Sequence, residues 1–242
     1  YVLAEQALQQ TNAEKTAWEY WQNRIDTLPA GPVLPLAKQP AEIEKPKFIR
    51  LSHRLSVKQW SLLKQRGKQA NLTPSMILCA VYADVLALWS KSQHFTLNLT
   101  LFNRLPLHPK TQQIVGDFTT LILLERQASS GLSFEQRAKQ LQQQLVTDME
   151  HRQINGIRVL RDIAKNTDNA GTPIVFTSAL PLTDNEDSDD YPTDWLGEQV
   201  YSITQTPQVW LDHQVNEHHG ELMLSWDLVE EICPNCFEIR KE

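Results

Sequence analysis

The chain has 242 residues, of which 41% are hydrophobic and 21% are charged, a composition typical of a globular protein with a sizeable core. Its formal net charge is −6 and no stretch is strongly basic, so it lacks the electrostatic signature of a nucleic-acid-binding protein. The most apolar segment, residues 76–89, contains Asp84 and is too short to cross a bilayer, and the first residues lack the pattern of a signal peptide. We therefore expect neither nucleic acid nor a membrane as a partner.

The first part of the chain is predicted to be helical over residues 1–28 and extended over residues 29–46. The extended part contains five prolines, which disfavour a helix and indicate a linker. Period-two alternation, cap residues and apolar periodicity then predict a strand at 48–55 and helices at 56–70 and 74–91.

The same patterns continue through the second part of the chain. They predict strands at 95–101, 119–126, 173–178 and 199–203, and helices at 133–152 and 156–166. Residues 183–194 are acidic without the spacing of a calcium-binding loop, so we interpret them as a solvated loop. Helices interleaved with strands predict an α/β fold with a mixed parallel and antiparallel sheet.

Residues 207–231 predict a β-hairpin, with a turn at Asn-Glu-His-His-Gly. In its first strand an apolar face broken by His213 alternates with a face that carries Asp212 beside Gln214. A carboxylate in the middle of a strand needs partners if it is buried, which makes Asp212 a candidate site residue.

Thr177, at the end of the strand at 173–178, is the second polar residue on a strand that looks buried. A threonine hydroxyl donates and accepts hydrogen bonds and a carboxylate transfers protons, so the two residues together indicate acid–base chemistry. Satisfied structural polar groups would give the same pattern, and the residues alone leave both interpretations open.

Three cysteines are too few for a disulfide framework and favour a reducing, cytoplasmic location. Cys233 and Cys236 form a CxxC pair, but no second CxxC and no histidine pair at zinc-finger spacing accompanies them. The sequence also lacks the dinucleotide, P-loop, GxSxG and HExxH motifs. We therefore predict no metal site and no bound cofactor.

Five stretches of the sequence, in order, resemble motifs of the heterocyclization domain of nonribosomal peptide synthetases. They span residues 28 to 234: LPAGPVLPL (28–36), LTPSMILCAVYADVLALWS (72–90), VGDFTTLILLE (115–125), PIVFTSAL (173–180) and TQTPQVWLDHQVNEHHGELMLSWDLVEEICP (204–234). The last stretch matches the family pattern QTPQVxLDHQVxExxGxLxxxWDxVEExFP and is the most specific of the five.

The resemblance implies a fold like that of chloramphenicol acetyltransferase, in which two lobes meet at a tunnel. The motifs present are those of the C-terminal lobe, expected at 47–242 after an entering helix and linker at 1–46. The first lobe's DxxxxDxxS motif is not matched, because Asp184 and Asp189 have the spacing but Pro192 replaces the serine. We expect the chain to be a piece of a longer polypeptide that lacks the N-terminal lobe and is inactive alone.

The family condenses an acyl thioester with a carrier-bound Cys, Ser or Thr and then cyclodehydrates the amide to a thiazoline or oxazoline. The resemblance implies that Asp212 and Thr177 are catalytic, and Gln205, Gln208 and Ser178 are predicted to bind substrate. The implied partners are upstream and downstream peptidyl or aryl carrier domains, whose 4'-phosphopantetheine carries the substrates, together with an adenylation domain and the missing lobe.

Two alternatives stay open at this point. One is a plain condensation domain that forms only the amide, and the other is a non-catalytic lobe that docks carrier proteins. The sequence leaves undecided the amino-acid substrate, the acyl donor and the oligomeric state. A siderophore is a reasonable product, because thiazolines and oxazolines chelate iron.

Overall fold

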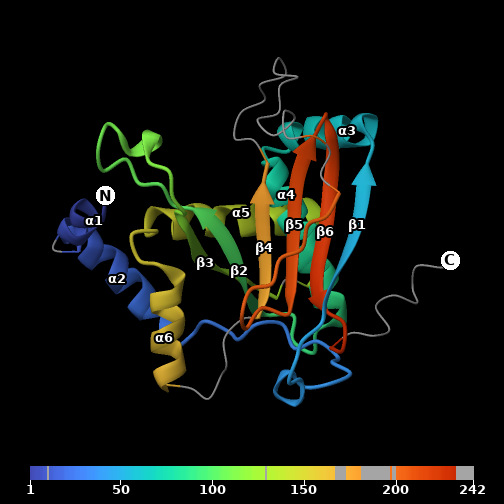
Figure 1. The fold of residues 1–242 in the computed structure, drawn as a ribbon, viewed down its shortest axis with the longest axis horizontal. Coiled ribbons are helices and arrows are strands. Elements are labelled where there is room, and N and C mark those ends of the chain that lie inside the picture. The colour runs from blue at the N-terminus through green and yellow to red at the C-terminus, as the bar shows by residue number, and fades with distance from the viewer. Residues whose placement is uncertain (10, 129, 167–172, 181–196, 198–199, 233–242) are drawn as a thin grey trace. The chain divides into compact units, whose positions relative to one another are not determined.

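The computed structural model divides the chain into two compact units, which are described separately below (Figure 1). The first unit comprises residues 1–32 and 92–172, and the second comprises residues 33–91 and 173–242. The predicted entering helix and linker at 1–46 and the predicted C-terminal lobe at 47–242 refer to a larger domain, and this division stays a prediction. The structure describes all residues except 10, 129, 167–172, 181–196, 198–199 and 233–242.

Four strands of the second unit lie side by side in a mixed sheet with the order β1-β6-β5-β4 (Figure 1). The strands are β1 (Phe48–Leu55), β4 (Ile174–Ala179), β5 (Leu211–His218) and β6 (Glu221–Val229). β6 pairs antiparallel with both β1 and β5, and β5 pairs parallel with β4. The predicted mixed sheet is therefore confirmed within this unit.

The predicted hairpin is present, with a shorter turn than the sequence indicated. Only His219 and Gly220 connect β5 to β6, because His218 already pairs with Glu221. Both turn residues have positive φ angles, 49° and 73°, the combination that a two-residue turn matching the strand twist requires. The predicted strand at 199–203 is wrong over the described residues 200–203, which have no regular secondary structure.

Helices α3 (Val57–Gln69) and α4 (Pro74–Trp89) follow β1. Their predicted starts are confirmed: Ser56 accepts a hydrogen bond from the Gln59 N–H, and Thr73 accepts one from the Met76 N–H. α4 contributes nine buried residues, so the predicted central helix is confirmed as part of the core. No described helix is by itself long and apolar enough to span a membrane. Only α3 and α4 taken together, with a bend of 98° between them, have the length and composition of a membrane span.

The first unit pairs two antiparallel strands with helices. Its elements are α1 (Val2–Leu8), α2 (Asn12–Ile25), β2 (Phe95–Phe102), β3 (Thr119–Arg126), α5 (Phe134–Glu150) and α6 (Gly156–Asn166). Short 3₁₀ turns occur here at Thr111–Gln113 and in the second unit at Pro40–Glu42. β3 packs against both α5 and α6, and α2 packs against α6. The predicted strands and helices of this part are present, and the helical start is divided into two helices.

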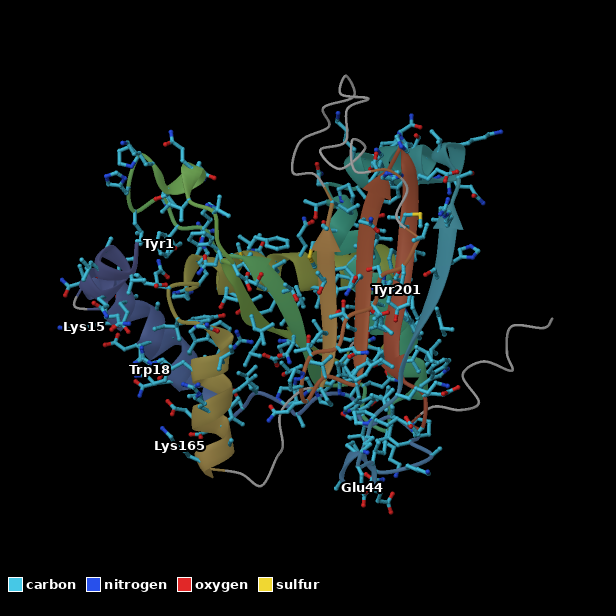
Figure 2. All side chains as sticks on the ribbon, viewed as in Figure 1. Tyr1, Lys15, Trp18, Glu44, Lys165 and Tyr201 are labelled. Carbon is cyan, nitrogen blue, oxygen red and sulfur yellow. The ribbon has the colours of Figure 1, made fainter. Side chains whose placement is uncertain are left out.

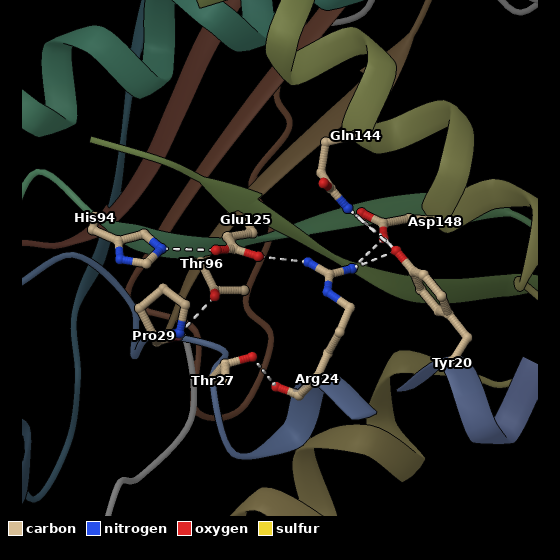
Figure 3. Close-up of polar contacts among 9 residues, drawn as sticks. All are labelled: Tyr20, Arg24, Thr27, Pro29, His94, Thr96, Glu125, Gln144 and Asp148. Atoms are coloured by element: carbon tan, nitrogen blue, oxygen red, sulfur yellow. Dashed lines mark hydrogen bonds and ion pairs between the residues drawn. The ribbon is translucent and has the colours of Figure 1, made fainter. Parts of the chain in front are cut away.

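A charged network joins α2, α5 and β3 in the first unit (Figure 3). Arg24 donates to Asp148 and, over 2.8 Å, to Glu125, while Asp148 also accepts from Tyr20 over 2.6 Å and from Gln144 over 3.0 Å. The Asp148 side chain is fully buried, and burial raises its pKa against the opposing effect of Arg24. Arg24 is thus the charge that allows a carboxylate in the interior of this unit.

We expect replacement of Gly156 by alanine to destabilise the first unit by about 1–3 kcal/mol, the usual cost of overpacking. A Cβ at Gly156 would lie 2.7 Å from the Leu121 carbonyl oxygen, so α6 would have to move away from β3. Denaturant unfolding checks this, with Gly116→Ala as the control because only the Phe118 ring, at 3.7 Å, lies near that position. Equal midpoints for both variants would contradict the close approach.

Candidate active site on the polar face of the sheet

The parallel pairing of β4 and β5 brings Thr177 and Asp212 together. In the register, Val175 lies opposite Asp212 and Thr177 lies opposite Gln214, so the four side chains lie on one face of the sheet. Three of the four are polar. The Thr177 Oγ1 donates to Asp212 Oδ1 over 3.3 Å, and Gln214 Nε2 donates to Asp212 Oδ2 over 2.8 Å. Each carboxylate oxygen of Asp212 therefore has a hydrogen-bond donor.

Residue Asp212 is 6% exposed, and the surroundings of its carboxyl group act on its pKa in both directions. Burial raises the pKa of Asp212 above its ordinary value, and the hydrogen bonds from Gln214 and Thr177 oppose that increase. The charge of Asp227 raises the pKa further, and the charge of Arg50 lowers it. A raised pKa brings a carboxyl group closer to neutral pH, where a general acid–base group is most effective.

A hydrogen-bonded ion pair lies on the same face beside Asp212. Arg50 on β1 is opposite Asp227 on β6, and Asp227 is opposite Asp212 on β5. The Arg50 Nε donates to Asp227 Oδ1 over 2.7 Å, and the Arg50 Nη2 donates to Asp227 Oδ2 over 2.5 Å and to Gln214 Oε1 over 3.2 Å. The backbone N–H of Thr204 also donates to Asp227, over 2.6 Å.

A cavity of about 370 Å³ opens on this polar face. Figure 2 shows Tyr201, from the irregular segment before β5, in front of β5 and β6. The lining of the cavity includes Arg50, Thr177, Tyr201, Gln214 and Ser225. Thr177 and Gln214 line the cavity and also donate to Asp212, so a single layer of side chains separates the carboxyl group from the cavity.

The opposite face of the sheet is apolar and covered by α4. Tyr82 packs against Phe176, His213 and Trp226, with ring centroids 4.8 to 6.1 Å apart. Burial lowers the pKa of His213 to about 4, so this imidazole is neutral at physiological pH, and its Nδ1 lies 3.1 Å from the Ser225 carbonyl oxygen. His213, which was predicted to interrupt the apolar face, thus packs in that face as an uncharged ring.

The structure does not bring the three predicted substrate-binding residues to Asp212. Ser178 lies on the helix-covered face, where its hydroxyl is 2.8 Å from that of Ser75 at the start of α4. Gln205 and Gln208 are exposed in the segment before β5, and Gln208 has a φ angle of 67°. Their binding roles stay predictions, as do the catalytic roles of Thr177 and Asp212.

Sequence reasoning missed Gln214 and Arg50 as site residues. The signal was available in part, because Gln214 follows Asp212 at the period-two spacing that puts both on one face. Arg50 gave no comparable signal, since its contact with Gln214 depends on the pairing of β1 with β6. Cys233, Cys236 and the acidic loop at 183–194 lie outside the described residues. The described part of the chain holds no cluster of three or more potential metal ligands.

The sequence model of the condensation-domain family matches residues 1–225 of this chain. The chain belongs to the condensation-domain family. This domain is 41% identical over 236 residues to Bacitracin synthase 1 of Bacillus licheniformis, and the match covers 96% of the domain and 4% of that protein. It is 38% identical over 213 residues to Phenyloxazoline synthase MbtB of Mycobacterium sp. (strain MCS), covering 88% of the domain and 18% of that protein.

Among solved structures, the condensation-family chain is similar to the EpoB NRPS cyclization-docking bidomain from Sorangium cellulosum. The TM-score is 0.86 at 39% identity, and the match covers 99% of this chain and 48% of that one. The likeness confirms the predicted α/β fold and the resemblance to the heterocyclization branch of the condensation superfamily. The chain spans only a small part of the curated relatives and about half of the solved bidomain.

Proposed function

We propose that this condensation-family chain forms part of a heterocyclization domain, which joins an acyl thioester to carrier-bound Cys, Ser or Thr and closes the side chain onto the new amide. The observation that carries the proposal is the buried Asp212 carboxyl group, which accepts hydrogen bonds from Thr177 and Gln214, two residues that line a cavity. The likeness to a cyclization domain supports the same chemistry, as does the similarity to a protein named phenyloxazoline synthase.

Ring closure requires proton transfers that one carboxyl group can perform. The side-chain sulfur or oxygen attacks the amide carbonyl carbon and loses its proton, while the carbonyl oxygen gains one and becomes a hydroxyl. That hydroxyl then leaves as water when it receives a second proton, and the amide nitrogen loses its proton as the C=N bond forms. Asp212 accepts and returns these protons, and the burial that raises its pKa favours the protonated form that gives a proton to the leaving hydroxyl.

Thr177 and Gln214 orient the Asp212 carboxyl group in this mechanism. Their donors occupy both carboxylate oxygens, and their side chains line the cavity in which the substrate amide would lie. The proposed partners are the carrier domains that deliver both substrates on 4'-phosphopantetheine, the adenylation domain and the complementary lobe. A siderophore product stays a prediction.

The experiment uses the intact synthetase polypeptide, because the chain spans 48% of the solved bidomain. Carrier domains loaded with Cys, Ser or Thr are combined with an acetyl thioester donor, and the carrier-bound product is analysed by mass spectrometry. We expect a product one water lighter than the linear amide for at least one amino acid. A linear amide with all three would instead establish a plain condensation domain, and no amide at all would indicate a docking lobe.

The pH dependence of ring closure is expected to change when Gln214 is replaced by leucine. The Gln214 hydrogen bond favours the charged carboxylate, so its loss raises the pKa of Asp212 further. The acid limb of the pH–rate profile should then move to higher pH, because the base form appears only at higher pH. Asn216→Leu is the control, since Asn216 lines the same cavity from the same strand. Identical profiles for Gln214→Leu and wild type would contradict the role of Gln214.

A further inference from the structure

The amide of Gln214 is hydrogen-bonded at both ends. Its Oε1 accepts from the Arg50 Nη2 over 3.2 Å, and its Nε2 donates to Asp212 over 2.8 Å and to the Thr204 hydroxyl. A guanidinium group has donors only and an ionised carboxylate has acceptors only. If the amide were reversed, its NH₂ group would face the Arg50 donors and its oxygen would face the Asp212 oxygen. Arg50 therefore determines which end of Gln214 faces Asp212.

Arg50 is itself held in one orientation. Its guanidinium binds Asp227 through two parallel hydrogen bonds of 2.7 and 2.5 Å, and Asp227 is anchored by the Thr204 N–H over 2.6 Å. The Asp227 side chain is fully buried and that of Arg50 is 20% exposed. Such forked pairing restricts an arginine far more than a single contact would.

The sheet register places these groups in a row across three strands. Arg50, Asp227 and Asp212 are successive partners on β1, β6 and β5, and two carboxylates on neighbouring strands repel each other unless a cation intervenes. Arg50 supplies that cation, and its Nη2, which donates to Asp227, also donates to Gln214. Its position lets it influence Asp212 through both the charge of Asp227 and the orientation of Gln214.

We propose that Arg50 is a positioning residue for ring closure, which acts by fixing the Gln214 amide so that it donates to Asp212. This inference rests on the proposed function of the chain. Arg50 acts through Gln214 and takes no proton itself, so its loss should impair cyclodehydration and spare amide formation.

The test compares Arg50→Met, Arg50→Lys and Arg54→Met in the intact synthetase, with carrier-bound Cys and an acetyl thioester donor as probes. Arg54 lies on the same strand and contacts Glu221 over 3.8 Å, with a 68% exposed side chain, so it controls for loss of an arginine from β1. We expect Arg50→Met to slow ring closure by up to about 100-fold, the cost of a misplaced catalytic group, with linear amide accumulating at the wild-type rate. Arg50→Lys keeps the charge without the fork and should share the defect.

A double-mutant cycle separates action through Gln214 from a general structural effect. If Arg50 works through Gln214, Arg50→Met costs much less ring closure in a Gln214→Ala background than in the wild type. Ring closure by Arg50→Met and Arg50→Lys at the rate of Arg54→Met, or losses that add fully in the double variant, would overturn the inference. Should Arg50→Met not fold, Arg50→Lys decides alone.

Asp212→Asn is assayed beside these variants to keep the two proposals apart. If Asp212→Asn forms ring product as wild type does, the proposed function of this site fails, and the role of Arg50 fails with it. If Asp212→Asn stops ring closure while the Arg50 variants cyclise normally, only the inference about Arg50 is wrong.

Discussion

Replacement of Asp212 by asparagine is expected to leave amide formation intact and to slow ring closure by about 10²- to 10⁴-fold, the usual contribution of a general acid–base group. Asparagine has the shape of aspartate but transfers no proton at neutral pH. Its oxygen can accept from Gln214 and its NH₂ group can donate to the Thr177 hydroxyl, so both hydrogen bonds at this position can be kept. The loss should therefore reflect proton transfer rather than a rearranged site.

Mass spectrometry of the carrier-bound product distinguishes these steps, because the uncyclised amide is heavier by one water. Glu217→Gln is the matched control: Glu217 lies on the same strand but faces α3, where it accepts from the Trp60 indole over 2.6 Å. Thr177→Ala should accumulate the same linear product as Asp212→Asn. Ring product from Asp212→Asn at the wild-type rate would mean that Asp212 and Thr177 are structural in this domain.

Replacement of Arg24 by methionine is expected to destabilise the first unit by about 3–5 kcal/mol, the cost of removing one partner of a buried ion pair. Asp148 would keep only Tyr20 and Gln144 as donors, and Glu125 would keep His94 (Figure 3). Because the Asp148 carboxyl group is fully buried, its charge has no access to water that would replace the guanidinium. Thermal or denaturant unfolding measures the loss.

The deficit of Arg24→Met should shrink as the pH is lowered. Burial already raises the pKa of Asp148, and without Arg24 the pKa rises further, so the folded chain holds this proton more tightly than the unfolded chain. The penalty for burying the Asp148 charge is therefore complete above the pKa that Asp148 has in the folded variant. It disappears below the pKa that Asp148 has in the unfolded chain. The pKa of Glu125 is lowered by His94 and Arg24 despite burial, so its lost contribution also matters only while it is ionised.

Lys139→Met is the control for Arg24→Met. Its ion pair with Glu135 is exposed on both sides, and such i,i+4 pairs contribute about 0.3–0.5 kcal/mol. A loss for Arg24→Met that matches this control, or one that does not change with pH, would contradict the view that Arg24 stabilises a buried charge.

Strand β5 shows how one segment serves packing and chemistry together. Leu211, His213 and Val215 pack on one face, while Asp212 and Gln214 face the cavity side. A shift of register by one residue would exchange the two sets, so burial of the apolar face also holds the polar residues in place.

Local patterns in the sequence were sufficient to predict most of the elements. Ser56 and Thr73 marked helix starts because their side chains satisfy the first free N–H groups, and alternation located the hairpin at 207–231. The strand predicted at 199–203 was wrong, because β propensity does not ensure that a segment pairs with another strand. The described residues 200–203 form no strand. The turn was predicted too long because the polar residues Asn216 to His218 still pair with β6.

The sequence by itself determined the family, the alternation that puts Asp212 and Gln214 on one face, and the candidate pair of Asp212 and Thr177. These depend on neighbours along the chain or on motif identity. Only the tertiary structure decided that Ser178 lies on the opposite face from Asp212, that Arg50 reaches Gln214, and that Asp148 needs Arg24. Each of these depends on which strands and helices become neighbours, and strand pairing and packing join residues 100 or more positions apart through contacts that no local pattern encodes.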